Sequence, residues 1–140
     1  ADLSEAAIED AITSIRGATD SVGLKENLRA MSLHINQANE FEALRITKSV
    51  LQNDTALNAV NAIRVSGQLP NGIKVNPYLD DTDAWFIRTD AENSLIHFQR
   101  NPLTFGEDAA FDNKVQKYAC YERYSVKWAN WRGLYGNAGA

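Results

Sequence analysis

The chain has 140 residues, a length that fits one domain with a hydrophobic core of its own. Hydrophobic residues make up 44% of it and charged residues 23%, a balance that is typical of a globular protein and excludes a disordered one. No apolar run approaches the roughly 18 residues of a membrane-spanning helix, and a single cysteine excludes an intramolecular disulfide.

The formal net charge of −4 is unevenly distributed along the chain. Residues 1–43 contain eight acidic and three basic side chains, a balance of −5, whereas residues 44–140 contain ten and eleven, a balance of +1. The acidic part argues against nucleic-acid binding there, and the remainder has no dense cluster of lysine and arginine. The asymmetry fits either unlike faces that meet in an assembly or a solvated helix face.

The first predicted element is an amphipathic helix. Ser4 is a good N-cap, Gly17 is a plausible C-terminal stop, and acidic residues lie in the first turns, where the helix dipole favours them. An apolar stripe with spacings of three and four is formed by Leu3, Ala7, Ile8, Ala11, Ile12 and Ile15.

A strand and a second helix are predicted next. Residues 28–35 alternate in a way that predicts a strand with two partly covered faces. Asn39 is the predicted N-cap of the following helix, with Glu42 in the third position of a capping box. Residues 57–65 are interpreted as a short helical turn or a loop with apolar anchors. The buried stripe predicted for the second helix is Phe41, Leu44, Thr47, Val50 and Leu51.

Short strands are predicted in the middle of the chain. Residues 73–75 form one candidate, after a turn that contains Pro70 and Gly72. Residues 84–89 and 95–100 are aromatic and β-branched, and we predict that they pair as a hairpin.

A longer strand is predicted near the end of the chain. Residues 102–112 are expected to be irregular, and residues 115–128 form one extended run. At roughly 3.3 Å per residue this run spans about 46 Å, so it is bent or bulged, or it bridges two packed regions. Helices and antiparallel strands in mixed order predict an α+β fold.

The densest group of carboxylates consists of Asp80, Asp81 and Asp83. Hard cations bind such clusters, but the glycine and the distal glutamate of a calcium loop are missing. The pattern favours a solvated turn in which aspartate side chains accept hydrogen bonds from nearby backbone N–H groups.

Other chemically versatile residues are isolated. His34 and His97 each lie in the middle of a predicted strand, which favours a histidine with a satisfied hydrogen bond over a zinc ligand. Cys120 also lies within a predicted strand, and we interpret it as a buried structural cysteine. No metal, cofactor or catalytic site is predicted.

The aromatic residues of the last third are the strongest remaining signal. All three tryptophans, Trp85, Trp128 and Trp131, lie in the last 56 residues. Large rings on extended backbone without accompanying acids or bases suggest a surface that contacts other protein, although tryptophan is more often buried in a core. Arg132 lies among these rings, where it can pair across an interface or within the chain.

Several segments resemble a known family. Residues 3–11 (LSEAAIEDA) resemble the long spine helix of tailed-phage major capsid proteins. Residues 75–79 (VNPYL) and 81–86 (DTDAWF) are similar to the Mu-like prophage major head subunit group, as are residues 122–126 (ERYSV) and 131–136 (WRGLYG). The order of the motifs matches, and the resemblance covers essentially all 140 residues.

This resemblance implies a Hong Kong 97-type capsid fold. Residues 1–24 would contain the spine helix of a peripheral domain, residues 25–112 an axial domain, and residues 113–140 a long strand and tail that return to the peripheral domain, all as one compact unit. Full subunits of the family are longer, with an N-terminal arm and an extended hairpin ahead of the spine helix. The chain would thus correspond to the C-terminal portion of such a subunit.

The implied function is structural. Copies would pack as pentamers and hexamers, together with other head proteins, into a shell that encloses DNA in the virion, after synthesis in the cytoplasm of a bacterial host. Neither a membrane, a cofactor nor sequence-specific nucleic acid is implied. The candidate contact residues are Trp131, Arg132 and Tyr135 in the tail and Asn53, Asp54 and Asn58 in a polar loop expected near a symmetry axis.

Two other functions compete with this one. The first is an adaptor that binds another virion or host protein through its aromatic tail and does not self-associate. The second is a metal-dependent hydrolase that uses Asp80, Asp81 and Asp83.

Overall fold

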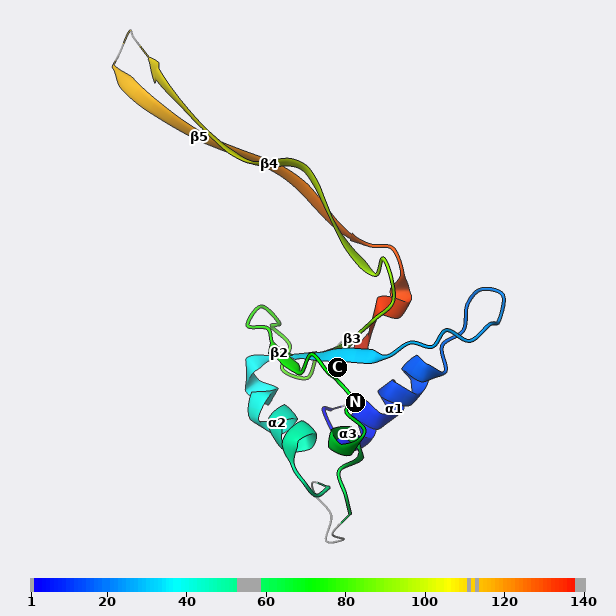
Figure 1. The fold of residues 1–140 in the computed structure, drawn as a ribbon. Helices are drawn as coiled ribbons and strands as arrows, with labels where there is room; N and C mark the ends of the chain where they lie inside the picture. The colour runs from blue at the N-terminus through cyan, green and yellow to red at the C-terminus, as the bar shows by residue number, and fades with distance from the viewer. Residues whose placement is uncertain (1, 53–58, 111, 113, 138–140) are drawn as a thin grey trace. The chain divides into compact units, whose positions relative to one another are not determined.

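The computed structural model describes residues 2–52, 59–110, 112 and 114–137. The chain divides into two compact units (Figure 1). The first unit comprises residues 1–92 and 131–140, and the ribbon unit comprises residues 93–130. Helices combine with parallel and antiparallel strand pairing, so the predicted α+β class is confirmed.

The first unit is built on a four-stranded sheet with the order β2-β1-β3-β6. The central strand β1 (Ala30–Ile35) pairs in parallel with β2 (Ile73–Val75) and antiparallel with β3 (Trp85–Thr89). The outer strand β6 (Leu134–Asn137) pairs antiparallel with β3. The strands predicted near residues 28–35, 73–75 and 84–89 are therefore present, and the sheet joins distant parts of the sequence.

Helix α1 (Glu5–Arg16) forms as predicted. The Ser4 hydroxyl accepts a hydrogen bond from the Ala7 N–H at 3.2 Å, and Gly17 ends the helix. The isoleucines of the predicted stripe, Ile8, Ile12 and Ile15, are buried, so this face packs into the core.

The second helix differs from its prediction. A short 3₁₀ turn, η1 (Gln37–Asn39), precedes α2 (Glu40–Lys48). The side chain of Asn36, not that of Asn39, accepts a capping hydrogen bond, from Ala38 N–H at 2.9 Å. Asn39 instead donates to the Thr82 carbonyl.

The predicted buried stripe of this helix is wrong. Ala43 and Ile46 are buried, whereas Phe41 is 70% exposed. The helix ends at Lys48, so the last two residues of the predicted stripe lie beyond it. Leu44, Val50 and Leu51 are exposed, and Thr47 is half-buried.

Residues 57–65 were interpreted as either a short helical turn or a loop. Their described part contains a helical turn, the short helix α3 (Ala62–Val65). Asn61 accepts a hydrogen bond from the Arg64 N–H at 3.1 Å, and its amide donates to the Ile46 carbonyl and the Ser49 hydroxyl. Asn61 is fully buried and so ties α3 to the end of α2.

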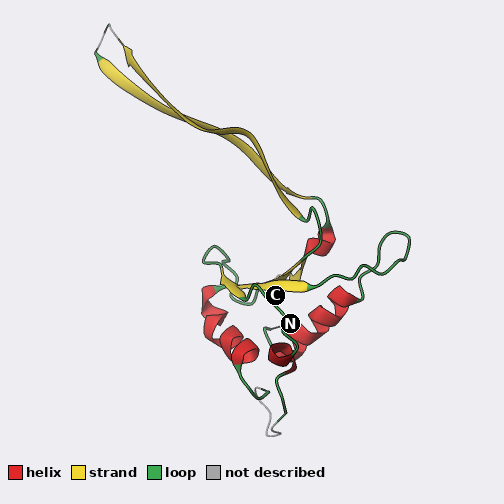
Figure 2. Ribbon diagram, in the orientation of Figure 1, coloured by secondary structure: helices red, strands yellow, loops and turns green. Residues whose placement is uncertain are grey.

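The core lies between one face of the sheet and the three helices (Figure 2). In register across β1 and β3, Leu33 lies opposite Ile87 and Ile35 lies opposite Trp85. The buried cluster combines these residues with isoleucines of α1, α2 and α3. Within the described part of the chain, no helix is both long and apolar enough to cross a membrane.

The ribbon unit consists of β4 (Leu95–Ala110) and β5 (Val115–Trp128), paired antiparallel. Strand β5 has the predicted bounds. The predicted hairpin between residues 84–89 and 95–100 is wrong, because β3 pairs with β1 and β6 while β4 pairs with β5.

The prediction that residues 102–112 are irregular is wrong for most of this range, because β4 continues as far as Ala110. The pairing register shifts between Gln99 and Asn101 and again between Asn101 and Thr104, so Pro102 lies at an irregularity. Proline lacks a backbone N–H and is tolerated in strands at such bulges. The long β5 is matched by an equally extended partner.

Candidate assembly surface

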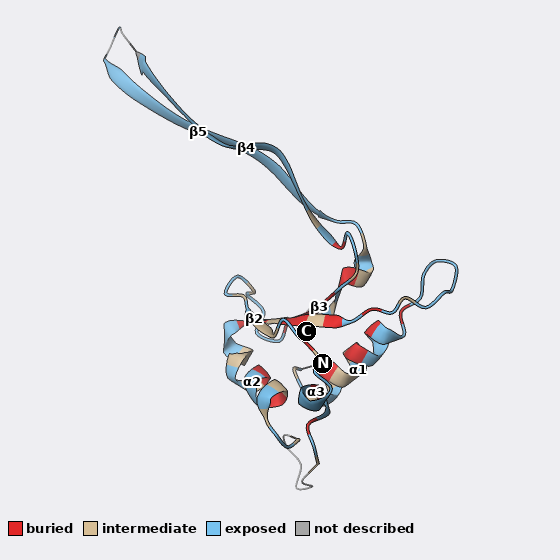
Figure 3. Ribbon diagram, in the orientation of Figure 1, coloured by how far each residue is buried: buried red, intermediate tan, exposed pale blue. Residues whose placement is uncertain are grey.

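The side chains of the ribbon unit are exposed along almost all of its length (Figure 3). Every residue of β5 is exposed. A two-stranded ribbon has no second layer of its own and is at best marginally stable in isolation. Apolar residues on such a ribbon are therefore available for contact with other protein.

Residues that lie opposite each other in an antiparallel pair share one face of the ribbon. On what we call the aromatic face, Leu95 lies opposite Trp128, Phe105 opposite Cys120, and Glu107 opposite Tyr118. Phe105 is 80% exposed, Tyr118 74% and Trp128 70%. The polar residues Gln99, Glu107, Gln116 and Glu122 share this face with its apolar and aromatic residues, which are Leu95, His97, Phe105, Ala109, Tyr118, Cys120, Tyr124, Val126 and Trp128.

A ring contact supports this assignment of the face. The ring centroids of His97 and Tyr124 lie 5.4 Å apart at an interplanar angle of 51°. His97 pairs with Val126, and Tyr124 is the neighbour two residues away, so the contact is the diagonal one expected on a shared face.

The opposite face of the ribbon is more basic, and we call it the basic face. Lys127 lies opposite Ile96, Arg123 opposite Asn101, and Lys117 opposite Asp108. The basic face also carries the exposed rings of Phe98 and Tyr121, so the two faces differ mainly in charge.

The interpretation of Cys120 as a buried residue is wrong. Its side chain is exposed, on the aromatic face opposite Phe105. The alternating pattern of β5 resembles that of a covered strand, but the only strand paired with it among the described residues is β4, and no layer of the ribbon unit covers its faces.

The tail residues lie in the first unit. Trp131 and Arg132 belong to the 3₁₀ turn η2 (Trp131–Gly133), and Tyr135 belongs to β6. The Trp131 side chain is 58% exposed, its ring centroid is 6.0 Å from that of Tyr135, and the Arg132 guanidinium carbon lies 4.8 Å from the Trp131 ring centroid. The expectation of buried tryptophans holds for Trp85, which is 4% exposed, but not for Trp128 or Trp131.

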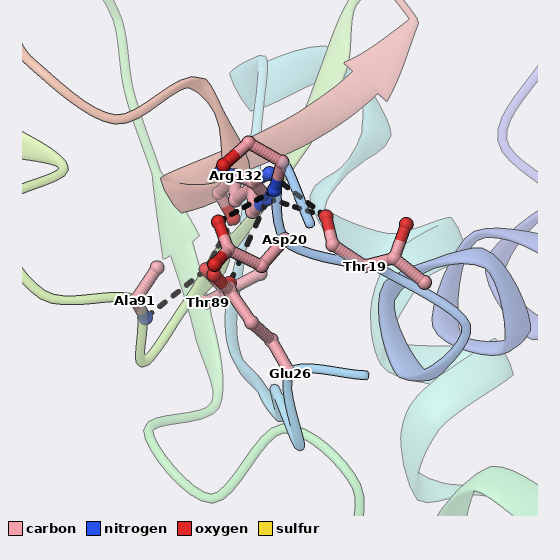
Figure 4. Close-up of polar contacts among 7 residues, drawn as sticks. Thr19, Asp20, Glu26, Thr89, Ala91 and Arg132 are labelled. Atoms are coloured by element: carbon pink, nitrogen blue, oxygen red, sulfur yellow. Dashed lines mark hydrogen bonds and ion pairs between the residues drawn. The ribbon is translucent and has the colours of Figure 1, made fainter. Parts of the chain in front are cut away.

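Arg132 is held by contacts within the chain (Figure 4). Its Nε and Nη2 atoms donate to the Thr19 carbonyl at 3.1 and 2.8 Å, and Nε lies 3.6 Å from the Glu26 carboxylate. The Thr89 hydroxyl donates to the Arg132 carbonyl at 2.7 Å. Arg132 thereby joins the tail to the segment after α1 and to the end of β3.

Tyr135 is half-buried on the core side of β6. Burial raises the pKa of its phenol, and the nearby Arg132 charge partly opposes this shift. Of the three predicted contact residues in the tail, Trp131 is thus the most accessible. Asn53, Asp54 and Asn58 lie outside the described residues.

The acidic and histidine residues form no metal site in the described part of the chain. Asp81 accepts a hydrogen bond from the Asp83 N–H at 2.9 Å, as expected of a solvated turn. The Ser32 hydroxyl lies 3.0 Å from His34 Nε2, so the prediction of a hydrogen-bonded strand histidine is confirmed there. Burial, followed by the charges of Arg88 and Lys74, lowers the pKa of His34.

The sequence agrees with a model of one protein family, described as phage capsid protein, over residues 1–137. The chain belongs to the phage capsid protein family. This family membership points to a structural role. No curated protein sequence matches the chain.

The fold is similar to that of a solved structure, a virus-like particle from Pyrococcus furiosus. The TM-score is 0.52 at 14% sequence identity, and the match covers 91% of this chain and 47% of the other. The capsid protein thus shares the fold of a particle-forming subunit and spans about half of that subunit's length.

Sequence reasoning found the start of β4, at residues 95–100, but missed its continuation to Ala110. The signal was present in the alternation of Leu103 and Phe105 with polar residues, but Pro102 and the glycine at 106 suggested a break.

Proposed function

We propose that this chain is the C-terminal part of the major capsid subunit of a tailed phage or prophage, whose copies assemble into an icosahedral shell around DNA. Membership of the phage capsid protein family over residues 1–137 carries this proposal. The exposed aromatic face of the ribbon supports it, because such a surface is best stabilised by contact with another copy.

The proposal includes a Hong Kong 97-type fold and the Mu-like prophage head subunit group. Residues 1–24 belong in it to the peripheral domain with the spine helix, residues 25–112 to the axial domain, and residues 113–140 to the returning strand and tail. The fold shared with a virus-like particle at 14% identity is compatible with this assignment.

Assembly in this proposal is mechanical and not catalytic. Copies form pentamers and hexamers, with other head proteins as further partners, in a virion produced in the bacterial cytoplasm. Each contact can be modest, because a closed shell repeats it many times. The subunit acts without a cofactor.

The aromatic face is the principal contact surface in this proposal. Phe105 and Tyr118 are exposed rings on that face, and burying rings of this size contributes strongly to association. Trp131 and Tyr135 form a smaller contact site on the tail, where Arg132 fixes the backbone through its bonds to Thr19.

Light scattering coupled to size-exclusion chromatography, over a wide range of concentrations, tests the proposal. We expect pentamers, hexamers or larger particles of the 140-residue chain. Replacing Phe105 and Tyr118 together by serine should shift the chain to monomers. At a concentration where the unmodified chain is also monomeric, the unfolding temperature should be unchanged, since both side chains are exposed.

The matched control replaces Phe41 and Tyr78, two exposed rings of the first unit, by serine. This variant should assemble as the unmodified chain does. A chain that remains monomeric at every concentration would contradict self-assembly by these residues and favour an adaptor. Equal loss of assembly in both variants would contradict a specific role of the ribbon.

A further inference from the structure

The first unit contains a cavity of about 460 Å³ beside the N-terminal end of β1. It lies between the end of α1, the segment that leads into β1, and the loop after α3. Six of the residues that line it are Arg16, Asn27, Arg29, Ser66, Gln68 and Pro70. No acidic residue lines this arginine cavity, although Glu9 lines an adjoining hollow that shares Arg16.

The two arginines of this cavity are the cationic groups of its lining. Within the described residues, neither Arg16 nor Arg29 donates a side-chain hydrogen bond or forms an ion pair. The Asp90 carboxylate accepts a hydrogen bond from the backbone N–H of Arg29 at 2.8 Å, not from its guanidinium group. Two unpaired guanidinium groups at one cavity form a site for carboxylates.

The wall of the cavity is held in place by backbone hydrogen bonds. Gly67 N–H donates to the Arg64 carbonyl at 3.2 Å, and Gln68 N–H donates to the Ile63 carbonyl at 3.3 Å. The Ser66 hydroxyl donates to the Ala62 carbonyl at 2.6 Å. The loop after α3 is therefore fixed before any ligand arrives, which lowers the entropic cost of binding.

At the other end of β1 the chain presents an acidic loop, residues 80–83. Asp80, Asp81 and Asp83 are exposed. The Asn36 amide donates to the Asp81 carbonyl at 3.3 Å, and the Asn39 amide donates to the Thr82 carbonyl at 2.5 Å. These bonds fix the loop backbone against the residues that follow β1, so three carboxylates are presented on a constrained segment.

The arginine cavity and the acidic loop cannot meet within one copy. Arg29 precedes β1 and Asn36 follows it, so the strand Ala30–Ile35 separates the two features. Five residue steps at roughly 3.3 Å correspond to about 17 Å. Complementary features at opposite ends of one strand suit a head-to-tail contact, which closes into a ring when the rotation between copies permits it.

We infer that the arginine cavity of one copy receives the acidic loop of a neighbouring copy. Arg16 and Arg29 bind carboxylates among Asp80, Asp81 and Asp83 of the neighbour, and repetition of this contact orders copies around an axis. The inference rests on the proposed self-assembly and adds a contact distinct from the ribbon. It also gives the three aspartates a function that needs no metal.

Charge reversal tests the contact. The cavity variant carries Arg16→Glu and Arg29→Glu, and the loop variant carries Asp80→Lys and Asp83→Lys, leaving Asp81 and its hydrogen bond to the Asp83 N–H intact. We expect each variant alone to self-associate at least about tenfold more weakly at low salt, because like charges then face each other.

An equal mixture of the two variants provides the decisive measurement. In the mixture the acidic loop of the cavity variant meets unmodified arginines, and the lysines of the loop variant meet glutamates. Sedimentation velocity should show association restored to within about threefold of the unmodified chain. A folding defect would not be repaired by mixing.

Two control substitutions separate this contact from general charge effects. Arg64→Glu changes an exposed cation of α3 that does not line the cavity, and Glu92→Lys changes an exposed acid after β3. Both should associate as the unmodified chain does.

The other outcomes distinguish this inference from the proposed function. Unchanged assembly of both reversed variants would overturn the contact and leave self-assembly standing. A monomeric unmodified chain would overturn both. Unchanged assembly combined with loss of binding to a double-stranded DNA oligonucleotide in the cavity variant alone would identify the cavity as a phosphate site and overturn the inference.

Discussion

The first unit and the ribbon unit use similar apolar side chains in opposite ways. In the first unit Leu33 and Ile87 lie opposite each other on paired strands and are completely buried, because helices cover that face of the sheet. On the ribbon, Phe105 and Tyr118 also present large rings, but both are exposed. A strand's sequence pattern therefore describes which side chains share a face, whereas the presence of a second layer decides whether that face is core or contact surface.

The largest expected difference between the units concerns two glycines in strands. A Cβ at position 136 would lie 2.2 Å from the Trp85 carbonyl oxygen and 2.8 Å from the Phe86 Cα, whereas a Cβ on Gly106 of the ribbon would meet nothing within 4 Å. Because backbone atoms cannot yield easily, Gly136→Ala should lower the free energy of unfolding by about 3 kcal/mol.

Gly106→Ala is the control and should change that free energy by less than about 1 kcal/mol. Urea unfolding followed by tryptophan fluorescence measures both values. Similar destabilisation by the two substitutions would mean that Gly136 of β6 does not lie against the backbone of Trp85 and Phe86 in β3.

A matched pair of leucines tests the contrast in burial. Leu33 is completely buried on β1, and Leu103 on β4 is 50% exposed. Leu33→Ala should cost about 3 kcal/mol of unfolding free energy through the cavity it leaves, whereas Leu103→Ala should cost below about 1 kcal/mol. Thermal unfolding at a concentration where the chain is monomeric is the appropriate measurement. A large cost at Leu103 would show that the ribbon packs within the monomer.

The smallest expected effect is a pH dependence that belongs to the first unit. Burial and the cations Arg88 and Lys74 lower the pKa of His34 below its ordinary value of 6.5, so the unfolded chain binds this proton more readily than the folded chain. Stability is therefore undiminished above pH 6.5 and declines as the pH falls from 6.5 through the lowered pKa of the folded state.

His34→Gln should remove the loss of stability below pH 6.5. The control, His97→Gln on the ribbon, should show the same loss as the unmodified chain. Urea midpoints between pH 5 and 8 measure the effect, and an NMR titration of the His34 ring gives its pKa directly. An unchanged decline in the His34 variant would assign it to other groups. The imidazole is half-buried, so solvent still screens these charges and the change should be small.

Local signals in the sequence predicted much of the first unit. Ser4 and Gly17 set the ends of α1 because capping depends on adjacent backbone groups. The strands at Ile73–Val75 and Trp85–Thr89 followed from composition and turn residues. The pairing of β3 with β1 and β6 could not be predicted in this way, since it depends on contacts between distant segments.

The candidate surface was harder to predict for a related reason. The bounds of β5 were predicted from the alternation of its side chains between two faces. The same alternation suggested that Cys120 was buried, but it is exposed. The start of β4 was predicted at residues 95–100, but its continuation was not, because Pro102 signals an interruption. In the structure Pro102 lies at a register irregularity, and the strand continues beyond it. The importance of Trp131 for contact remains a prediction, and its exposure agrees with it.

The place of the ribbon in the chain has a further consequence. Strand β3 precedes residues 93–130 and β6 follows them, and β3 and β6 are antiparallel neighbours in the sheet, with Arg88 opposite Leu134. The ribbon is thus an insertion between two strands that would otherwise form an ordinary hairpin. Insertions at such positions can be lengthened, shortened or replaced by a tight turn while the host sheet keeps its register. Related chains can therefore vary the length of the ribbon without redesigning the sheet of the first unit.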